Sequence, residues 1–182
     1  MQTLGLSNAT PRTEGRLKSL FWPSIRNSSD VDYLGVQGYW LCGIVAIVAF
    51  LSSLAAGKPV LGVFVLLFYY LGGVGVRERS RYAAAAVFLI YLIDMAVGAG
   101  LIRVIIAGVL FSNLRATWVA AGWNPESNEA IRPPRMEDSW SDRFTDKLPP
   151  WLWPKVRVLF YVLSIVFTLL SVVGVVAHFK NR

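Results

Sequence analysis

Apolar residues are gathered in five continuous blocks, and polar residues lie between the blocks or near the ends of the chain. Four blocks lie within residues 39–121, and a fifth lies in residues 156–182; they cover residues 39–56, 60–76, 83–98, 101–117 and 156–179. A water-soluble fold of 182 residues does not need this much continuous apolar sequence. The pattern therefore predicts an all-α integral membrane helical bundle.

The number of crossings depends on how residues 82–123 are interpreted. They predict either one long kinked helix, for four crossings in all, or two short helices that turn at Gly98-Ala99-Gly100, for five. Four crossings divide the lysines and arginines equally, nine to each side, whereas five crossings place 14 on the side of the N-terminus and 4 opposite. Because loops rich in lysine and arginine stay cytoplasmic, we prefer five transmembrane helices with a cytoplasmic N-terminus and keep four as the alternative.

Tryptophan positions agree with five crossings, since amphipathic aromatic rings favour the level of the lipid head groups. Trp40 begins the first block, Trp118 and Trp123 follow the fourth, and Trp151 and Trp153 precede the fifth. We interpret these five residues as interfacial anchors.

Residues 1–38 are predicted to form a cytoplasmic polar tail. Within it, apolar residues recur at helical spacing over residues 17–25 beside lysine and arginine, which predicts a short interfacial helix limited by Pro23. A disordered tail that carries a few apolar residues by chance fits the same stretch.

The connection over residues 122–155 differs in composition from the bundle, because it holds six of the nine prolines and six of the eleven acidic residues. Trp140, Phe144 and Leu148 follow one another at four-residue spacing. They predict a short amphipathic helix on the membrane or on the cytoplasmic end of the bundle. The proline-rich stretch 149–154 is expected to stop this helix before the last crossing.

Asp94 lies within the third block, where a carboxylate is costly unless it is neutralised, paired or hydrated. If the chain turns back at residue 99, antiparallel counting places Asp94 beside Arg103. We expect an intramembrane ion pair between them that ties the third and fourth crossings together. The alternatives are a proton or cation site in a polar cleft, and a protonated Asp94 that hydrogen-bonds a neighbouring helix.

Small residues at four-residue spacing mark the predicted helix-packing surfaces, because lipid gives helices no hydrophobic reason to associate. The two rows are Ala49, Ser53 and Gly57, and Gly108, Ser112, Ala116 and Ala120. Such rows suit packing inside the bundle or against another chain. Asn113 and Thr117, one turn apart, are expected to hydrogen-bond across helices.

Composition limits the classes of function. A formal net charge of +7 would suggest nucleic acid in a soluble protein, but here lysine and arginine lie at block ends, where they face anionic lipid. One cysteine, Cys42, and one histidine, His178, build neither a disulfide nor a zinc site nor a pair of haem ligands. We expect no cofactor, no metal, no nucleic-acid partner and no catalysis.

The sequence therefore predicts a non-enzymatic multi-pass protein of the plasma or inner membrane. Its expected role is that of a structural or accessory subunit that packs against a larger membrane partner or against itself. The alternative is a small transporter or channel subunit with a polar site around Asp94. A sensor or a lipid-interacting scaffold that acts through residues 122–154 is the third class.

Overall fold

The structure is a computed structural model that describes residue 18 and residues 21–96, 98, 100–123, 134–135 and 140–180. The described part of the chain is helical and contains no strand. Its elements are α2 (Ser28–Ala55), α3 (Pro59–Arg77), α4 (Arg81–Met95), α5 (Leu101–Ala121), α6 (Trp140–Asp142), the π-helix η1 (Arg143–Lys147) and α7 (Leu148–Lys180). This architecture confirms the predicted all-α fold class.

Four helical segments are long and apolar enough to cross a membrane: α2, α3, α5 and the continuous stretch Trp140–Ala177. Helix α4 has 15 residues. At 1.5 Å per residue it is about 22 Å long. Many large apolar side chains on the long helices are exposed in the isolated chain, as expected of surfaces that face lipid. The protein is a multi-pass membrane protein built as a helical bundle.

Helix α2 begins at Ser28, well before the first predicted block at residue 39. Asn27 accepts a hydrogen bond from the backbone N–H of Asp30 at 3.0 Å, and the Asp30 carboxylate accepts from the backbone N–H of Asn27 at 3.4 Å. This reciprocal capping box satisfies backbone donors that a helix leaves unpaired at its start. The last residues of the predicted polar tail 1–38 therefore belong to the first long helix.

Two short turns connect the first three long helices: one makes antiparallel neighbours of α2 and α3, and the other joins α3 to α4. The first turn requires a left-handed backbone at Gly57 (φ 70°), which glycine adopts without a Cβ clash. Pro59 then starts α3, where a missing N–H costs no intrahelical hydrogen bond. In the second turn Arg79 has a φ of 60°, and the Ser80 hydroxyl caps α4 by accepting from the N–H of Ala83 at 3.3 Å.

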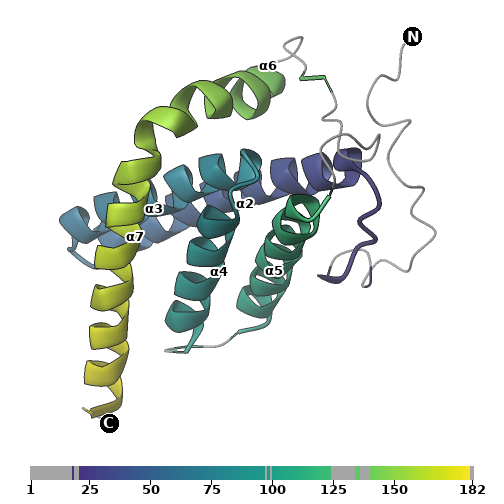
Figure 1. Ribbon diagram of the computed structural model, residues 1–182. Coiled ribbons are helices and arrows are strands. Elements are labelled where there is room, and N and C mark those ends of the chain that lie inside the picture. The colour runs from purple at the N-terminus through teal and green to yellow at the C-terminus, as the bar shows by residue number, and fades with distance from the viewer. Residues whose placement is uncertain are drawn as a thin grey trace.

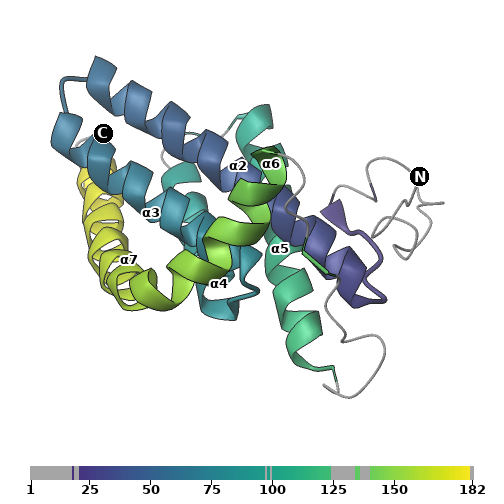
Figure 2. The same ribbon diagram turned by 90° about the horizontal axis from the view of Figure 1, so that it is seen from above.

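The long helices form two hairpins and one further helix. Helices α2 and α3 make the first hairpin, α4 and α5 make the second, and α7 runs beside α3 and α4 (Figure 1). The first hairpin is inclined to the other long helices, as the view from above also shows (Figure 2). The buried residues of α2 lie between Ser28 and Ala46, and most of those of α3 between Val65 and Arg77. The bundle is therefore packed at the end that carries Arg77 and open at the other.

Aromatic stacking and one glycine join α3 to its neighbours. Phe68 on α3 stacks with Phe160 and Phe167 on α7, with ring centroids 5.5 and 5.1 Å apart. A Cβ on Gly72 would lie 2.4 Å from Cγ2 of Val87 on α4 and 3.3 Å from the Phe160 ring. The glycine-rich end of α3 is thus where α4 and α7 approach most closely.

Helical structure is continuous over residues 140–180, although prolines were expected to interrupt it. In η1 the N–H of Leu148 donates to the carbonyl of Arg143, which is the wider π spacing. This part runs across one end of the bundle before α7 turns along it (Figure 1). A proline removes one N–H and bends a helix without necessarily ending it. The boundary predicted at residue 156 therefore lies inside one helix.

The segment before α2 packs along α5. Of the predicted interfacial helix, Lys18 and Phe21 are helical and the N–H of Trp22 donates to the carbonyl of Lys18 at 2.8 Å, whereas residues 17, 19 and 20 lie outside the described residues. The carbonyl of Phe21 accepts a hydrogen bond from the Ser112 hydroxyl at 3.0 Å, and the carbonyl of Pro23 accepts one from Nη1 of Arg115 at 2.8 Å. The Arg115 guanidinium also lies 4.2 Å from the Trp22 ring centroid. Residues 22–26 are not helical, since Pro23 interrupts the pattern and α5 satisfies the backbone carbonyls.

Candidate functional site

Arg77 is the most deeply buried charged side chain in the described part of the chain, at 1% exposure. Its guanidinium donates from Nη1 to Oδ1 of Asp32 on α2 at 2.5 Å. On η1, Nη2 donates to Oδ1 of Asp146 at 2.5 Å and Nε to the carbonyl of Thr145 at 2.9 Å. Arginine suits this position because its planar group holds five donors in a fixed geometry. One side chain thereby joins α2, α3 and η1.

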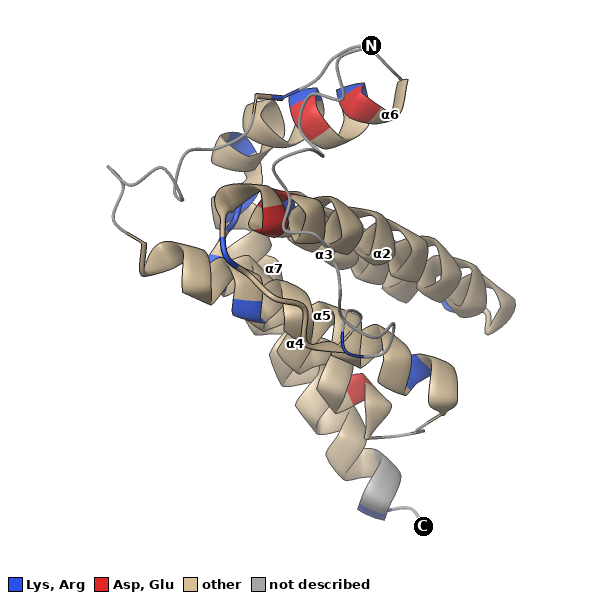
Figure 3. Cartoon of the chain, turned by 90° about the vertical axis from the view of Figure 1, so that its right-hand side faces the viewer, with Lys and Arg blue, Asp and Glu red and all other residues tan. Residues whose placement is uncertain are grey.

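Further ion pairs surround Arg77. Nη2 of Arg79 lies 3.6 Å from Oδ1 of Asp32, and Nη1 of Arg135 lies 2.9 Å from Oε1 of Glu78. Figure 3 shows acidic and basic residues close together in the helical segment at α6, at one end of the bundle. Three arginines face three carboxylates here, so their formal charges cancel. We call this site the Arg77 cluster; it consists of Asp32, Arg77, Glu78, Arg79, Arg135, Thr145 and Asp146.

The prolines at positions 149 and 150 explain why η1 offers backbone acceptors to the Arg77 cluster. In an α-helix their N–H groups would bond the carbonyls of Thr145 and Asp146, but proline has no N–H. The Thr145 carbonyl instead accepts from Arg77 at 2.9 Å, and the Asp146 carbonyl accepts from Nη1 of Arg135 at 3.1 Å. Arginines from distant parts of the chain thus satisfy carbonyls that are costly to bury unpaired.

The Arg77 cluster brings four segments together at one end of the bundle: the start of α2, the end of α3, residue 135 and η1. Glu78 contacts Arg135, and Arg77 contacts Asp146. Because these contacts join the chain before α4 to the chain after α5, the start of α4 and the end of α5 lie toward the same end of the bundle.

The structure places Asp94 and Arg103 at the tip of the α4–α5 hairpin, away from the Arg77 cluster. Nη1 of Arg103 lies 3.8 Å from Oδ2 of Asp94 and donates a hydrogen bond to the carbonyl of Gly98 at 2.6 Å. The two side chains are 45% and 64% exposed. Asp94 is the last residue but one of α4, so the pair lies beside the turn and not midway along the helix.

The small-residue row on α2 divides between two roles. Ser53 faces α3, because a Cβ on Gly62 would lie 3.0 Å from the Ser53 Cβ, and Ala49 is partly buried against the core. Gly57 differs from its predicted packing role. No atom lies within 4 Å of the position its Cβ would take, and its positive φ closes the turn after α2.

The small-residue row on α5 packs inside the chain. A Cβ on Gly108 would lie 2.0 Å from the Phe21 ring, and the buried Ser112 hydroxyl bonds the Phe21 backbone. Ala116 is buried in a cluster with Val31 and Leu34 of α2, and Ala120 packs against that cluster. The row therefore receives the chain's own N-terminal segment and α2.

Asn113 and Thr117 are both buried, but the hydrogen bonds that they donate stay within α5. Nδ2 of Asn113 donates to the carbonyl of Val109 at 2.9 Å, and the Thr117 hydroxyl donates to that of Leu114 at 2.8 Å. Oδ1 of Asn113 is buried without a hydrogen-bond partner in the described structure and faces Gly38 of α2. Helices α2 and α5 therefore approach closely at Gly38, and the predicted hydrogen bond from Asn113 to another helix is not observed.

The predicted tryptophan anchors occupy different environments. Trp118 and Trp151 are exposed, and each has a cationic side chain near its ring, at 5.5 and 3.6 Å from the centroid. Trp123 and Trp153 are partly buried against apolar clusters. Trp40 is 37% exposed but lies within α2, because that helix begins at Ser28. It therefore does not mark the start of a helix, as the sequence pattern suggested.

Sequence reasoning missed the Arg77 cluster because it counted Arg77 only among the cations of a cytoplasmic connection. Three features of the sequence pointed to it. Asp32 precedes the first apolar block, Arg77 ends a glycine-rich helix that lets neighbours approach, and Asp146 precedes two prolines that free backbone carbonyls. Their relation appears only when three helices are placed together.

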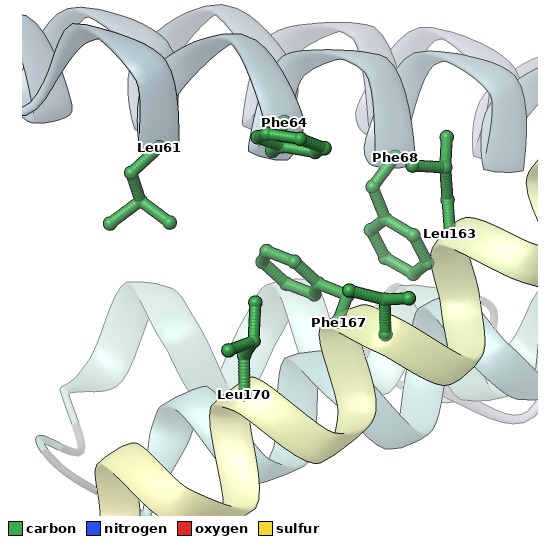
Figure 4. A pocket seen from close by; sticks show the side chains of 7 residues that line it. Leu61, Phe64, Phe68, Leu163, Phe167 and Leu170 are labelled. Carbon is green, nitrogen blue, oxygen red and sulfur yellow. The ribbon is translucent and has the colours of Figure 1, made fainter.

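The ion pairs and hydrogen bonds of the Arg77 cluster hold the start of α2, the end of α3 and η1 together. Within the described ranges, no group of three or more His, Cys, Asp and Glu side chains is arranged to hold a metal ion. A pocket between α3 and α7 is lined by apolar side chains only (Figure 4): Leu61, Phe64, Phe68, Leu163, Val166, Phe167 and Leu170.

Comparison with known proteins found no relative: no protein-family model, curated protein or solved structure matches the chain.

Proposed function

We propose that the chain is a non-enzymatic accessory subunit of a larger membrane assembly. The observation that carries this proposal is the isolation of α7. In the most apolar window of the stretch Trp140–Ala177, only 6% of the residues are buried inside the chain. Beyond Ser164, α7 exposes a continuous apolar surface that includes Ile165, Leu169 and Val173. A transmembrane helix that diverges from its own bundle offers its surface to helices of another protein.

The placement of polar groups favours this role over transport. A transport path needs several polar groups that converge near the middle of the membrane. Here Asp94 and Arg103 lie at the tip of a hairpin, and the pocket between α3 and α7 is apolar. The charged side chains of the Arg77 cluster form ion pairs with one another within the same chain.

Affinity purification in a mild detergent tests the accessory role. We expect the full chain to co-elute with other membrane proteins at a fixed stoichiometry. Substitution of Ile165 and Leu169 by alanine on the exposed side of α7 should reduce that co-elution, whereas the same change at Ile47 and Leu51 on α2 serves as the matched control. A chain that elutes alone as a monomer would contradict the proposal.

We also propose that the chain crosses the plasma or inner membrane five times, with the N-terminus in the cytoplasm and the C-terminus outside. Two observations support this orientation. The Arg77 cluster joins the segments before α4 and after α5, so the two helices cross as a pair. With five crossings, 14 lysines and arginines lie on the side of the cluster and 4 lie opposite, as the retention of cations in the cytoplasm requires.

Thiol labelling checks the orientation. In a Cys42→Ala background, we expect Ser141→Cys to react with a membrane-impermeant maleimide only after the cells are permeabilised. Lys180→Cys, on an exposed residue at the far end of α7, should react in intact cells. Labelling of Ser141→Cys from outside would overturn the proposed orientation, and labelling of neither position in intact cells would contradict the external C-terminus.

We propose a structural role for the pair of Asp94 and Arg103. Because each charge stabilises the other at the hairpin tip, Asp94→Asn and Arg103→Gln should each lower the yield of folded protein, and the double change should recover part of that loss. Folded yield is measured by size-exclusion chromatography in detergent. Normal yield together with lost ion flux in proteoliposomes would favour the transport alternative.

A further inference from the structure

The helical segment over residues 140–155 exposes aromatic and cationic side chains together. Trp140 and Trp151 are 70% and 59% exposed, and the Trp140 and Phe144 ring centroids are 4.6 Å apart. Nζ of Lys155 lies 3.6 Å from the Trp151 ring centroid. We call the exposed aromatic and cationic residues of this segment the basic aromatic face; they are Trp140, Arg143, Phe144, Lys147, Trp151 and Lys155.

The other side of the same segment is fixed to the bundle. Thr145 and Pro149 are buried, and Asp146 is held by Arg77. Farther along, Phe160 is fully buried against Phe68. The basic aromatic face is therefore the outward side of a helix whose inner side is anchored.

The basic aromatic face continues directly into the lipid-facing surface of α7. From Val158 onward the exposed side chains of α7 are predominantly apolar, including Leu159, Val162 and Ile165. A change along one helix from aliphatic residues to tryptophan, lysine and arginine is the pattern found where a helix passes from the acyl chains to the head groups. The position of the face on the helix thus matches the head-group layer.

We propose that the basic aromatic face binds the phosphate head groups of anionic phospholipids in the leaflet on the side of the Arg77 cluster. The cations supply the attraction to the phosphates, and the rings of Trp140 and Trp151 insert at the level of the glycerol backbone. This binding is separate from any protein partner. It also fixes the angle between the segment and α7, because both the inner and the outer side of the segment are then held.

Native mass spectrometry of the detergent-solubilised full chain, with equimolar phosphatidylglycerol and phosphatidylcholine, tests this proposal. We expect the wild-type chain to prefer phosphatidylglycerol. Each cation near the surface contributes about a fivefold gain in affinity. The triple change Arg143→Gln, Lys147→Gln and Lys155→Gln should therefore lower affinity for phosphatidylglycerol by about 100-fold, with affinity for phosphatidylcholine unchanged.

A matched variant removes three cations from the opposite side of the proposed topology: Lys58→Gln, Lys180→Gln and Arg182→Gln. We expect it to keep the wild-type preference. Equal loss in the two triple variants would mean that only net charge matters, and no loss in the first would mean that the face does not bind head groups; either result overturns the proposal. If the first triple variant does not fold, Lys155→Gln alone should still lower the affinity for phosphatidylglycerol by about fivefold.

Discussion

Replacing Arg77 by methionine is expected to lower the free energy of unfolding by about 3–5 kcal/mol, because it leaves Asp32 and Asp146 as buried or half-buried carboxylates without their cation. The Thr145 carbonyl also loses its donor. Arg77→Lys keeps the charge but cannot reach three acceptors in different directions, so we expect a loss of about 1–3 kcal/mol. Unfolding is measured by titration with sodium dodecyl sulfate in mixed micelles, followed by circular dichroism.

Lys58→Met is the matched control for Arg77→Met, since Lys58 is exposed at the other end of α3 and its side chain caps nothing. We expect it to change stability by less than about 0.5 kcal/mol. A double-mutant cycle adds a sharper test. Asp32→Asn should cost less in the Arg77→Met background than in the wild-type chain, and strict additivity would show that the two side chains do not interact.

Replacing Gly38 by alanine is expected to destabilise the protein by about 1–3 kcal/mol, because the added methyl group overfills the contact between α2 and α5. A Cβ on Gly38 would lie 2.5 Å from Oδ1 of Asn113 and 2.8 Å from Cγ1 of Val76. Thermal unfolding in detergent gives the measurement. The loss should be smaller in an Asn113→Ala background, which removes the nearer of the two obstacles.

Gly43→Ala provides the control on the same helix. No atom lies within 4 Å of the position that its Cβ would take. Alanine favours a helix over glycine by up to about 1 kcal/mol, so we expect this change to be neutral or stabilising. Similar losses at both positions would mean that α2 does not approach α5 closely at Gly38.

The apolar blocks were sufficient to predict the class of fold, whereas the turn between the third and fourth blocks was preferred only because of the distribution of lysine and arginine. In a membrane interior, backbone polar groups must form hydrogen bonds within a helix, so a continuous apolar block in such a protein is predicted to be helical. A glycine at the boundary between two blocks predicts a turn. The turn at Gly57 follows this rule, as does the end of α4 at Met95 before α5 begins at Leu101. The approach of Arg103 to Asp94 follows from antiparallel counting around the second turn, because both residues lie close to it in sequence.

The helix boundaries that lie in polar sequence were predicted less well from the apolar blocks than the fold class was. Helix α2 starts at Ser28 because Asn27 and Asp30 form a capping box, and a pattern of apolar residues alone does not register this signal. Residues 140–180 stay helical through their prolines because Arg77 and Arg135 bond the carbonyls that Pro149 and Pro150 leave free. In both cases polar side chains decided where helical structure began or continued.

By itself, the sequence determined that this chain is a helical membrane protein. Periodicity and hydropathy are properties of neighbouring residues, and lipid acts on them locally. Only the tertiary structure decided that Arg77 is buried, that it joins Asp32 and Asp146 across long stretches of sequence, and that α5 packs against α2 through Gly38. Such contacts form only between helices that are adjacent in space, and the packing of all the helices together determines which of them are adjacent.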